Sequence, residues 1–153
     1  KIPSSILDVG YGNGDFLSVA KDMIKDCYGS DIVQHHPVPE GCKFTSSLYD
    51  EQYDVVCFFD SLEHFNDIYE IKNLKTNYVY ISLPWCHYFS DEWFESWRHR
   101  RPNEHLWHFD NVSLIRFFDE VGYDLVQYSN IEDTIRKYEN YENILTGIFK
   151  KRQ

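Results

Sequence analysis

The chain has few basic residues for its length and lacks any long apolar run. Its 153 residues include 15 lysines and arginines against 25 aspartates and glutamates, which gives a net charge of −10. This charge opposes an extended phosphate-binding face, so we expect no nucleic-acid partner. No apolar stretch approaches the roughly 20 residues that cross a bilayer, and no signal peptide is recognisable. These absences predict a cytoplasmic protein without membrane contact.

Cysteine is scarce as well, and its spacing argues against a zinc site. The four cysteines contain no C-x-x-C pair, so reduced and mostly buried thiols are expected. These cysteines are Cys27, Cys42, Cys57 and Cys86. Internal repeats, low-complexity tracts and flexible linkers are also absent. The length therefore predicts a single domain over residues 1–153.

Strand-like and helix-like patterns alternate along this domain. Short apolar runs typical of buried strands are separated by stretches with a helical apolar stripe. The predicted strands are Ser5–Val9, Cys27–Asp31, Tyr53–Phe59, Asn77–Leu83, Tyr123–Tyr128 and Asn143–Phe149, and the predicted helices are Phe16–Ile24 and Val112–Val121. Such alternation predicts a doubly wound α/β fold with a mostly parallel sheet, whose ligands bind at the carboxyl ends of the strands.

A glycine-rich turn follows the first predicted strand. Gly10, Gly12 and Gly14 alternate with other residues immediately before a helix-like stretch. Glycine tolerates positive φ and lets the backbone approach a bound molecule, while the helix start offers unpaired N–H groups. The turn therefore predicts a nucleotide-like cofactor.

The spacing of this turn discriminates between cofactors. The dinucleotide fingerprint requires a glycine at its sixth position, which is Asp15 here, so a nicotinamide-dependent oxidoreductase is disfavoured. The run from Ile6 to Gly14, with Asp8 before the first glycine, instead resembles motif I of class I methyltransferases, which use S-adenosylmethionine (SAM). This resemblance implies the Rossmann-like methyltransferase fold, a seven-stranded sheet with an antiparallel last strand, and SAM as cofactor.

Asp31 is the second informative residue. It ends the second predicted strand, 21 residues after Gly10, where nucleotide-binding α/β folds place a carboxylate that accepts hydrogen bonds from ribose hydroxyls. A turn aspartate without a ligand is the alternative. With the resemblance, the expected cofactor contacts are Asp8, Gly10, Tyr11, Gly12, Asp31, Ile32, Phe58 and Phe59, the last two through their backbone.

The segment from Phe58 to Asp67 resembles one subgroup of these methyltransferases more specifically. Its acid-x-x-Glu-His run, Asp60 to His64, is similar to that of the O-methyltransferases of ubiquinone biosynthesis, in which such a set is associated with a divalent metal. Asp60, Glu63 and His64 would share one face of a helix and could hold a cation that lowers the pKa of an acceptor hydroxyl. General-base action by His64 and a purely structural role are the alternatives, and a metal is not the favoured reading.

An unusual segment, at about residues 85–110, contains all four tryptophans, four of the seven histidines and several arginines. A connection this long after a strand is typical of a lid or a functional insertion, and its aromatic and basic groups suit an anionic or sugar-like acceptor. The alternative is a small aromatic core with surface ion pairs. The candidate substrate contacts are Trp85, His87, Arg98, Arg101 and His105, and the candidate catalytic bases are His64, His87 and His108.

These features together predict a SAM-dependent methyltransferase that acts on a small molecule, with oxygen as the expected acceptor atom. A SAM-binding module without turnover, or a subunit of a larger assembly, is the alternative. The sequence predicts neither the acceptor's identity nor the oligomeric state.

Overall fold

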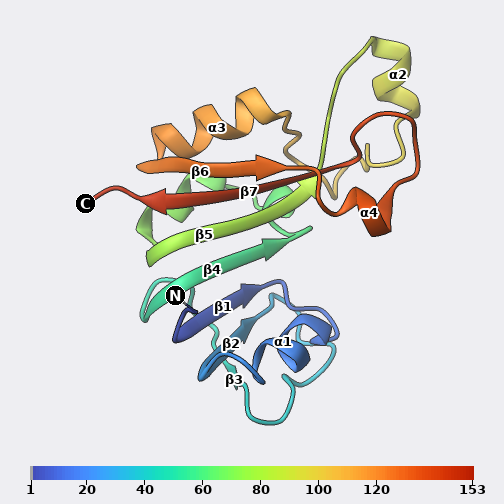
Figure 1. Ribbon diagram of the computed structural model, residues 1–153. Coiled ribbons are helices and arrows are strands. Elements are labelled where there is room, and N and C mark those ends of the chain that lie inside the picture. Colours follow the sequence, from blue (N-terminus) through green and yellow to red (C-terminus); the bar gives the residue numbers. More distant parts are fainter. Residues whose placement is uncertain (1) are drawn as a thin grey trace.

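A seven-stranded sheet forms the centre of the computed structural model, which describes residues 2–153 (Figure 1). The strands run in the order β3-β2-β1-β4-β5-β7-β6. Their bounds are Ser5–Val9 (β1), Asp26–Ser30 (β2), Lys43–Phe44 (β3), Gln52–Phe59 (β4), Lys75–Pro84 (β5), Tyr123–Ser129 (β6) and Ile144–Lys151 (β7). Neighbouring strands from β3 to β5 are parallel, whereas β7 is antiparallel to both β5 and β6. The predicted mostly parallel sheet with an antiparallel last strand is confirmed.

The helices are short and lie on the connections between strands. Their bounds are Asp15–Ala20 (α1), Asp91–Ser96 (α2), Asn111–Glu120 (α3) and Asp133–Arg136 (α4), and the 3-10 helices are Leu62–His64 (η1) and Ile68–Asn73 (η2). No helix within residues 2–153 is both long and apolar enough to span a bilayer.

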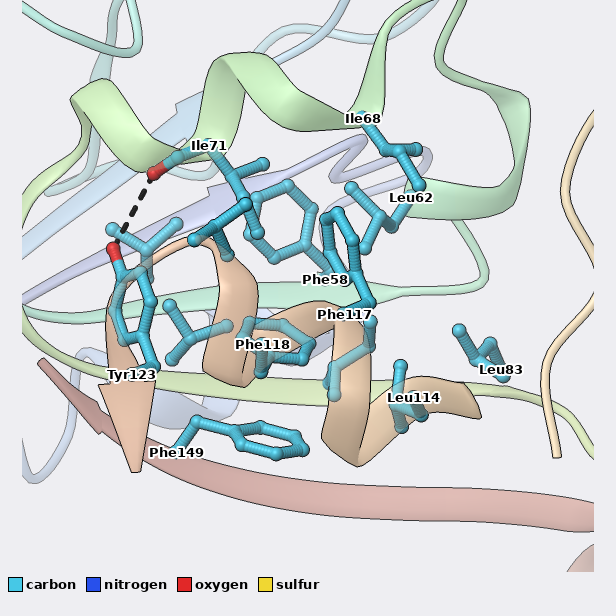
Figure 2. Packing of buried hydrophobic residues seen from close by; sticks show 14 of the residues in the cluster. Phe58, Leu62, Ile68, Ile71, Leu83, Leu114, Phe117, Phe118, Tyr123 and Phe149 are labelled. Atoms are coloured by element: carbon cyan, nitrogen blue, oxygen red, sulfur yellow. Dashed lines mark hydrogen bonds between the residues drawn. The ribbon is translucent and has the colours of Figure 1, made fainter. Parts of the chain in front are cut away.

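The largest hydrophobic cluster lies between the sheet and the elements η1, η2 and α3 (Figure 2). The ring of Phe118 stacks on Phe149 of β7, with a centroid distance of 3.9 Å. Tyr123 is 1% exposed, and its hydroxyl donates to the carbonyl of Ile71 at 3.4 Å. Because aromatic rings of this size bury large apolar areas, this layer provides the rigid support for β4 and β5.

Local sequence signals explain where α3 begins and ends. The Asp110 carboxylate accepts from the Ser113 amide at 2.7 Å, and the Ser113 hydroxyl accepts from the Asp110 amide at 3.0 Å, which forms a capping box. Gly122 follows the helix with φ +93°, a conformation that glycine adopts at low cost.

Several predicted boundaries were wrong. The first helix ends at Ala20 rather than Ile24, because the chain turns at the exposed residues that follow. The elements β3, α2 and α4 were not predicted, because they have two to six residues each and therefore lack a readable apolar period. β1, β4 and β5 lie where they were predicted, within about two residues.

Candidate cofactor and metal site

The glycine turn joins the carboxyl end of β1 to α1. Gly10, Gly12 and Gly14 all have positive φ, at 77°, 58° and 83°. A Cβ on Gly10 would lie 2.9 Å from Cβ of Ser61, and one on Gly14 would lie 2.9 Å from Cδ of Pro39. The backbone angles therefore favour glycine at all three positions, and the close approaches exclude a larger residue at Gly10 and Gly14.

Asp31 directly follows β2 and faces the glycine turn. Its Oδ2 accepts from the Gly12 amide at 3.2 Å, and its Oδ1 accepts from the Val33 amide at 3.4 Å. The carboxylate is thus fixed at the mouth of the turn, at a strand end where ligands bind in parallel α/β sheets. Ile32 is 96% exposed beside it, which places an apolar side chain at the same opening.

Asp8 lies beneath the turn, near the carboxyl end of β1. It is 2% exposed, and its Oδ1 has no hydrogen-bond partner within residues 2–153. Burial, together with the negative charge of Asp31, raises the pKa of Asp8 to about 7. A buried carboxyl group with a free oxygen fits a ligand that carries a positive charge.

A cavity of about 650 Å³ opens at this edge of the sheet. The ends of β1 and β2 and the connections that follow β1, β2, β3 and β4 line it. The lining residues are Val9, Gly10, Ser30, Asp31, Ile32, Ser46, Ser47, Leu48, Tyr49, Asp60, Ser61, His64, Phe65, Asn66, Asp67 and Glu70. The segment from Ser46 to Tyr49 was not foreseen, because it carries neither a motif nor a strand pattern.

Five of the expected cofactor contacts are not among the residues that line the cavity, namely Asp8, Tyr11, Gly12, Phe58 and Phe59. The Tyr11 hydroxyl donates to the carbonyl of His36 and so ties the next loop to the glycine turn. The side chain of Phe58 is fully buried in the large hydrophobic cluster (Figure 2). Phe59 packs between the rings of Phe16 and Tyr80, at 4.7 Å and 5.3 Å. A contact through the backbone of these two phenylalanines stays a prediction.

A second group of polar side chains lies next to the cavity. Glu63, His64 and His105 bring potential ligand atoms within 4.8 Å of one another. Glu63 is 2% exposed, and neither carboxylate oxygen finds a hydrogen-bond partner in the described part of the chain. Burial raises the pKa of Glu63 to about 8, so the site lacks the counter-charge that an ionised carboxylate needs.

The orientation of His105 completes this donor set. Its Nδ1 lies 2.7 Å from the carbonyl of His99, and as the donor in this bond it leaves Nε2 with a free lone pair. Burial lowers the pKa of His105, which favours the neutral imidazole that a metal requires. Two imidazoles and an unpaired carboxylate fit a divalent cation by the chemistry of their donors.

The expected trio of Asp60, Glu63 and His64 needs a correction. Asp60 precedes η1 with φ +49°, so it is outside the helical turn whose face it was predicted to share. Its Oδ2 lies 2.9 Å from Nη2 of Arg136. His105, predicted to contact substrate, takes the third place in the cluster instead.

The aromatic segment at about 85–110 largely packs on itself. The rings of Trp85, His87 and Phe89 stack in series, at centroid distances of 5.5 Å and 5.2 Å. Trp93 of α2 stacks on Trp97 at 5.2 Å. Amides of Leu106 and Trp107 donate to the carbonyl of Glu63 at 2.8 Å and 3.3 Å, so the end of the segment is held against η1.

Four further predicted site residues do not line the cavity. Nε2 of His87 lies 2.8 Å from the carbonyl of Glu142. His108 packs against Phe94 and Trp97, and burial lowers its pKa. Arg98 lies over the ring of Tyr138 at 3.8 Å, and exposed Arg101 pairs with Glu104 at 3.6 Å. Their roles in catalysis or substrate binding stay predictions, and these contacts favour the packing alternative.

The fold defines the class: an α/β protein with a mostly parallel sheet and a cavity at the carboxyl edge, where such folds bind their ligands. A family model described as "Methyltransferase domain" matches residues 1–128. The chain therefore belongs to the methyltransferase domain family. It is a class I methyltransferase, and its cofactor is SAM.

Solved structures share this fold at low sequence identity. A putative methyltransferase complex with the Trm112 activator from Haloferax volcanii has a TM-score of 0.72 and 16% identity over 98% of this chain and 83% of that chain. A putative SAM-dependent methyltransferase from Listeria monocytogenes has a TM-score of 0.67 and 14% identity over 98% of this chain and 92% of that chain. The small RNA methyltransferase HEN1 has a TM-score of 0.68 and 14% identity over 100% of this chain and 24% of that chain. A search of curated proteins gave no match.

Proposed function

We propose that this methyltransferase transfers the methyl group of SAM to a hydroxyl oxygen of a small molecule, with a divalent cation held by Glu63, His64 and His105. On this proposal the chain acts in the same way as the O-methyltransferases of ubiquinone biosynthesis, which its acid-x-x-Glu-His run resembles. The observation that carries this proposal is the group of potential ligand atoms on Glu63, His64 and His105. His64 also lines the cavity, so this group lies directly beside it.

The cofactor side of the site follows from the placement of its charges. Asp31 is positioned to accept hydrogen bonds from the ribose hydroxyls of SAM. The buried Asp8 favours the positively charged methionine end, whose approach would also lower the pKa of this carboxyl group. Glycines at positions 10 and 12 let that end lie close to the backbone.

The acceptor side follows from the chemistry of the cluster. A bound cation lowers the pKa of a coordinated hydroxyl, so the oxygen loses its proton and becomes nucleophilic at neutral pH. Imidazole ligands suit iron, nickel, copper or zinc better than magnesium, which prefers oxygen ligands. Positioning the acceptor in line with the methyl group supplies the rest of the rate enhancement.

An acceptor screen that detects S-adenosylhomocysteine tests this proposal. Small hydroxyl compounds and RNA oligonucleotides are incubated with SAM, with added Mn²⁺ or with EDTA. We expect turnover with a small hydroxyl compound, and a loss of at least about tenfold with EDTA or in Glu63→Gln. The exposed Glu51→Gln variant is the control and keeps full activity.

Other outcomes of the screen contradict the proposal in separate ways. Turnover with RNA alone would replace the small-molecule acceptor. Full activity in EDTA and in Glu63→Gln would remove the cation. SAM binding without turnover on any acceptor would favour a cofactor-binding module, which was the alternative from the sequence.

A further inference from the structure

The connection between β6 and β7 crosses the carboxyl edge of the sheet and carries α4 (Figure 1). Asp133 in α4 accepts hydrogen bonds from the amides of Asn143 and Ile144, both at 3.0 Å. Because these amides lie at the start of β7, the short helix is fixed to the sheet. It therefore presents its side chains to the site at a defined place.

Arg136 at the end of α4 pairs with two carboxylates. Its Nη2 lies 2.9 Å from Oδ2 of Asp60, and its Nη1 lies 2.9 Å from Oε2 of Glu132. The side chain of Arg136 is 27% exposed, and that of Glu132 is 17% exposed. The side chain of Asp60 is 40% exposed, so its pair with Arg136 is charge-assisted and partly buried.

Arg136 engages one oxygen of the Asp60 carboxylate, Oδ2, whereas Oδ1 is buried without a hydrogen-bond partner in the described part of the chain. The backbone of Asp60 is left-handed, and its amide donates to the carbonyl of Ser82 at 2.8 Å, so its position is set by β5. Glu63, His64 and His105 make up the ligand cluster without it. Asp60 nevertheless lines the same cavity as His64, and its charge acts on both Glu63 and His105.

We propose that Arg136 keeps Asp60 out of the coordination sphere, so that this chain holds its cation with three protein ligands and leaves one more position open to acceptor oxygen or water. This inference rests on the cation site of the proposed function. Arg136 is a positioning residue on this account, since it acts on the cation through Asp60. An ion that binds six ligands would then keep three positions for other molecules.

Mn²⁺ binding to the purified full chain, measured by electron paramagnetic resonance, tests the inference without any assay of activity. Wild type is compared with Arg136→Gln, Arg136→Lys and the double variant Arg136→Gln/Asp60→Asn. The double variant is the decisive one because it removes a positive and a negative charge together. Circular dichroism and SAM affinity report whether each variant is folded.

We expect Arg136→Gln to bind Mn²⁺ about tenfold more tightly, because the released Asp60 adds a ligand. Arg136→Lys keeps a cation opposite Asp60, so its affinity stays close to that of wild type. The double variant also returns to within about threefold of wild type, since Asp60 is not a ligand there. This pattern would support the inference.

Two results would overturn it. A double variant that binds Mn²⁺ at least about tenfold more weakly than wild type would show that Asp60 is already a ligand, while the cation site itself would stand. No Mn²⁺ binding by the folded wild type would remove the cation site and this inference together. Cofactor binding by Asp31 and the glycine turn would be untouched by either result.

Discussion

We expect Asp31 to hold the ribose end of SAM. Its carboxylate is already oriented by the Gly12 amide at the opening of the cavity. Hydrogen bonds to a charged acceptor contribute about 1.5 to 3 kcal/mol, so Asp31→Ala should weaken SAM binding by about tenfold or more. Isothermal titration calorimetry measures this change. Asp26→Ala, at the other end of β2, is the control, and equal affinities of the two variants would refute the ribose contact.

Asp8 makes the stability of the unliganded protein depend on pH. Its pKa is about 7 in the folded chain against 3.8 for a free side chain. Between these values the folded state holds a proton that the unfolded state has released, so the free energy of unfolding falls as pH rises from about 4 to 7. The ionisation of Asp8 lowers the free energy of unfolding over this interval by on the order of 1 to 4 kcal/mol.

Urea unfolding at pH 5 and pH 7.5, in the absence of ligand, measures that decline. Asp8→Asn should show a smaller loss of stability over this interval than wild type, because the amide does not ionise. The exposed Asp22→Asn variant should lose as much as wild type. Identical losses in wild type and Asp8→Asn would contradict the buried, protonated carboxyl group.

Single residues also show what could be inferred from the sequence about the site. Asp31, Gly10 and Ile32 were predicted from a motif and its spacing, and all three line the cavity. His105 joins Glu63 and His64 only because the aromatic segment folds back onto η1, and no local pattern encodes that contact. Arg136 was missed for the same reason, since its partner Asp60 belongs to a distant part of the chain.

Among the elements, β2 and α1 depend on each other through one glycine. A Cβ on Gly29 would lie 2.8 Å from Cδ1 of Tyr11, 2.9 Å from Cδ1 of Leu17 and 3.0 Å from Cγ1 of Val38. Overpacking of this kind costs about 1 to 3 kcal/mol. We therefore expect Gly29→Ala to destabilise the protein by this amount and to weaken SAM binding, since Tyr11 belongs to the glycine turn.

Chemical denaturation and SAM titration of Gly29→Ala check this expectation. Gly41→Ala is the comparison, because its Cβ would meet no atom within 4 Å and only its φ of +88° is unfavourable. It should leave SAM affinity unchanged. A Gly29→Ala variant as stable as wild type would mean that α1 and its neighbours move to accept the methyl group.

Elements differ in how well their sequences reveal them. β4 and β5 were readable because their apolar runs are long and buried in the parallel part of the sheet. By contrast, β3 has two exposed residues, and α2 has no buried residue, so tertiary contacts rather than an apolar period determine them. The aromatic segment was recognised by composition, whereas its internal stacking became visible only in the structure.

In the whole molecule, the titratable groups of the proposed cofactor and cation sites lie at one edge of the sheet. The carboxyl ends of β1, β2 and β4 supply Asp8, Asp31 and Asp60, while later connections supply His105 and Arg136. Carboxyl groups thus gather at the edge where a cationic cofactor and a divalent cation are proposed to bind. This arrangement follows from the parallel topology, which brings all these strand ends to the same side.

A thermal-shift comparison of SAM, S-adenosylhomocysteine and NAD on the intact protein tests the central claim most directly. At a concentration one hundred times the dissociation constant, a ligand stabilises the folded state by about 2.7 kcal/mol, which raises the Tm of a domain of this size by several degrees. The account predicts such a shift with SAM and S-adenosylhomocysteine and none with NAD. A shift with NAD alone would contradict it.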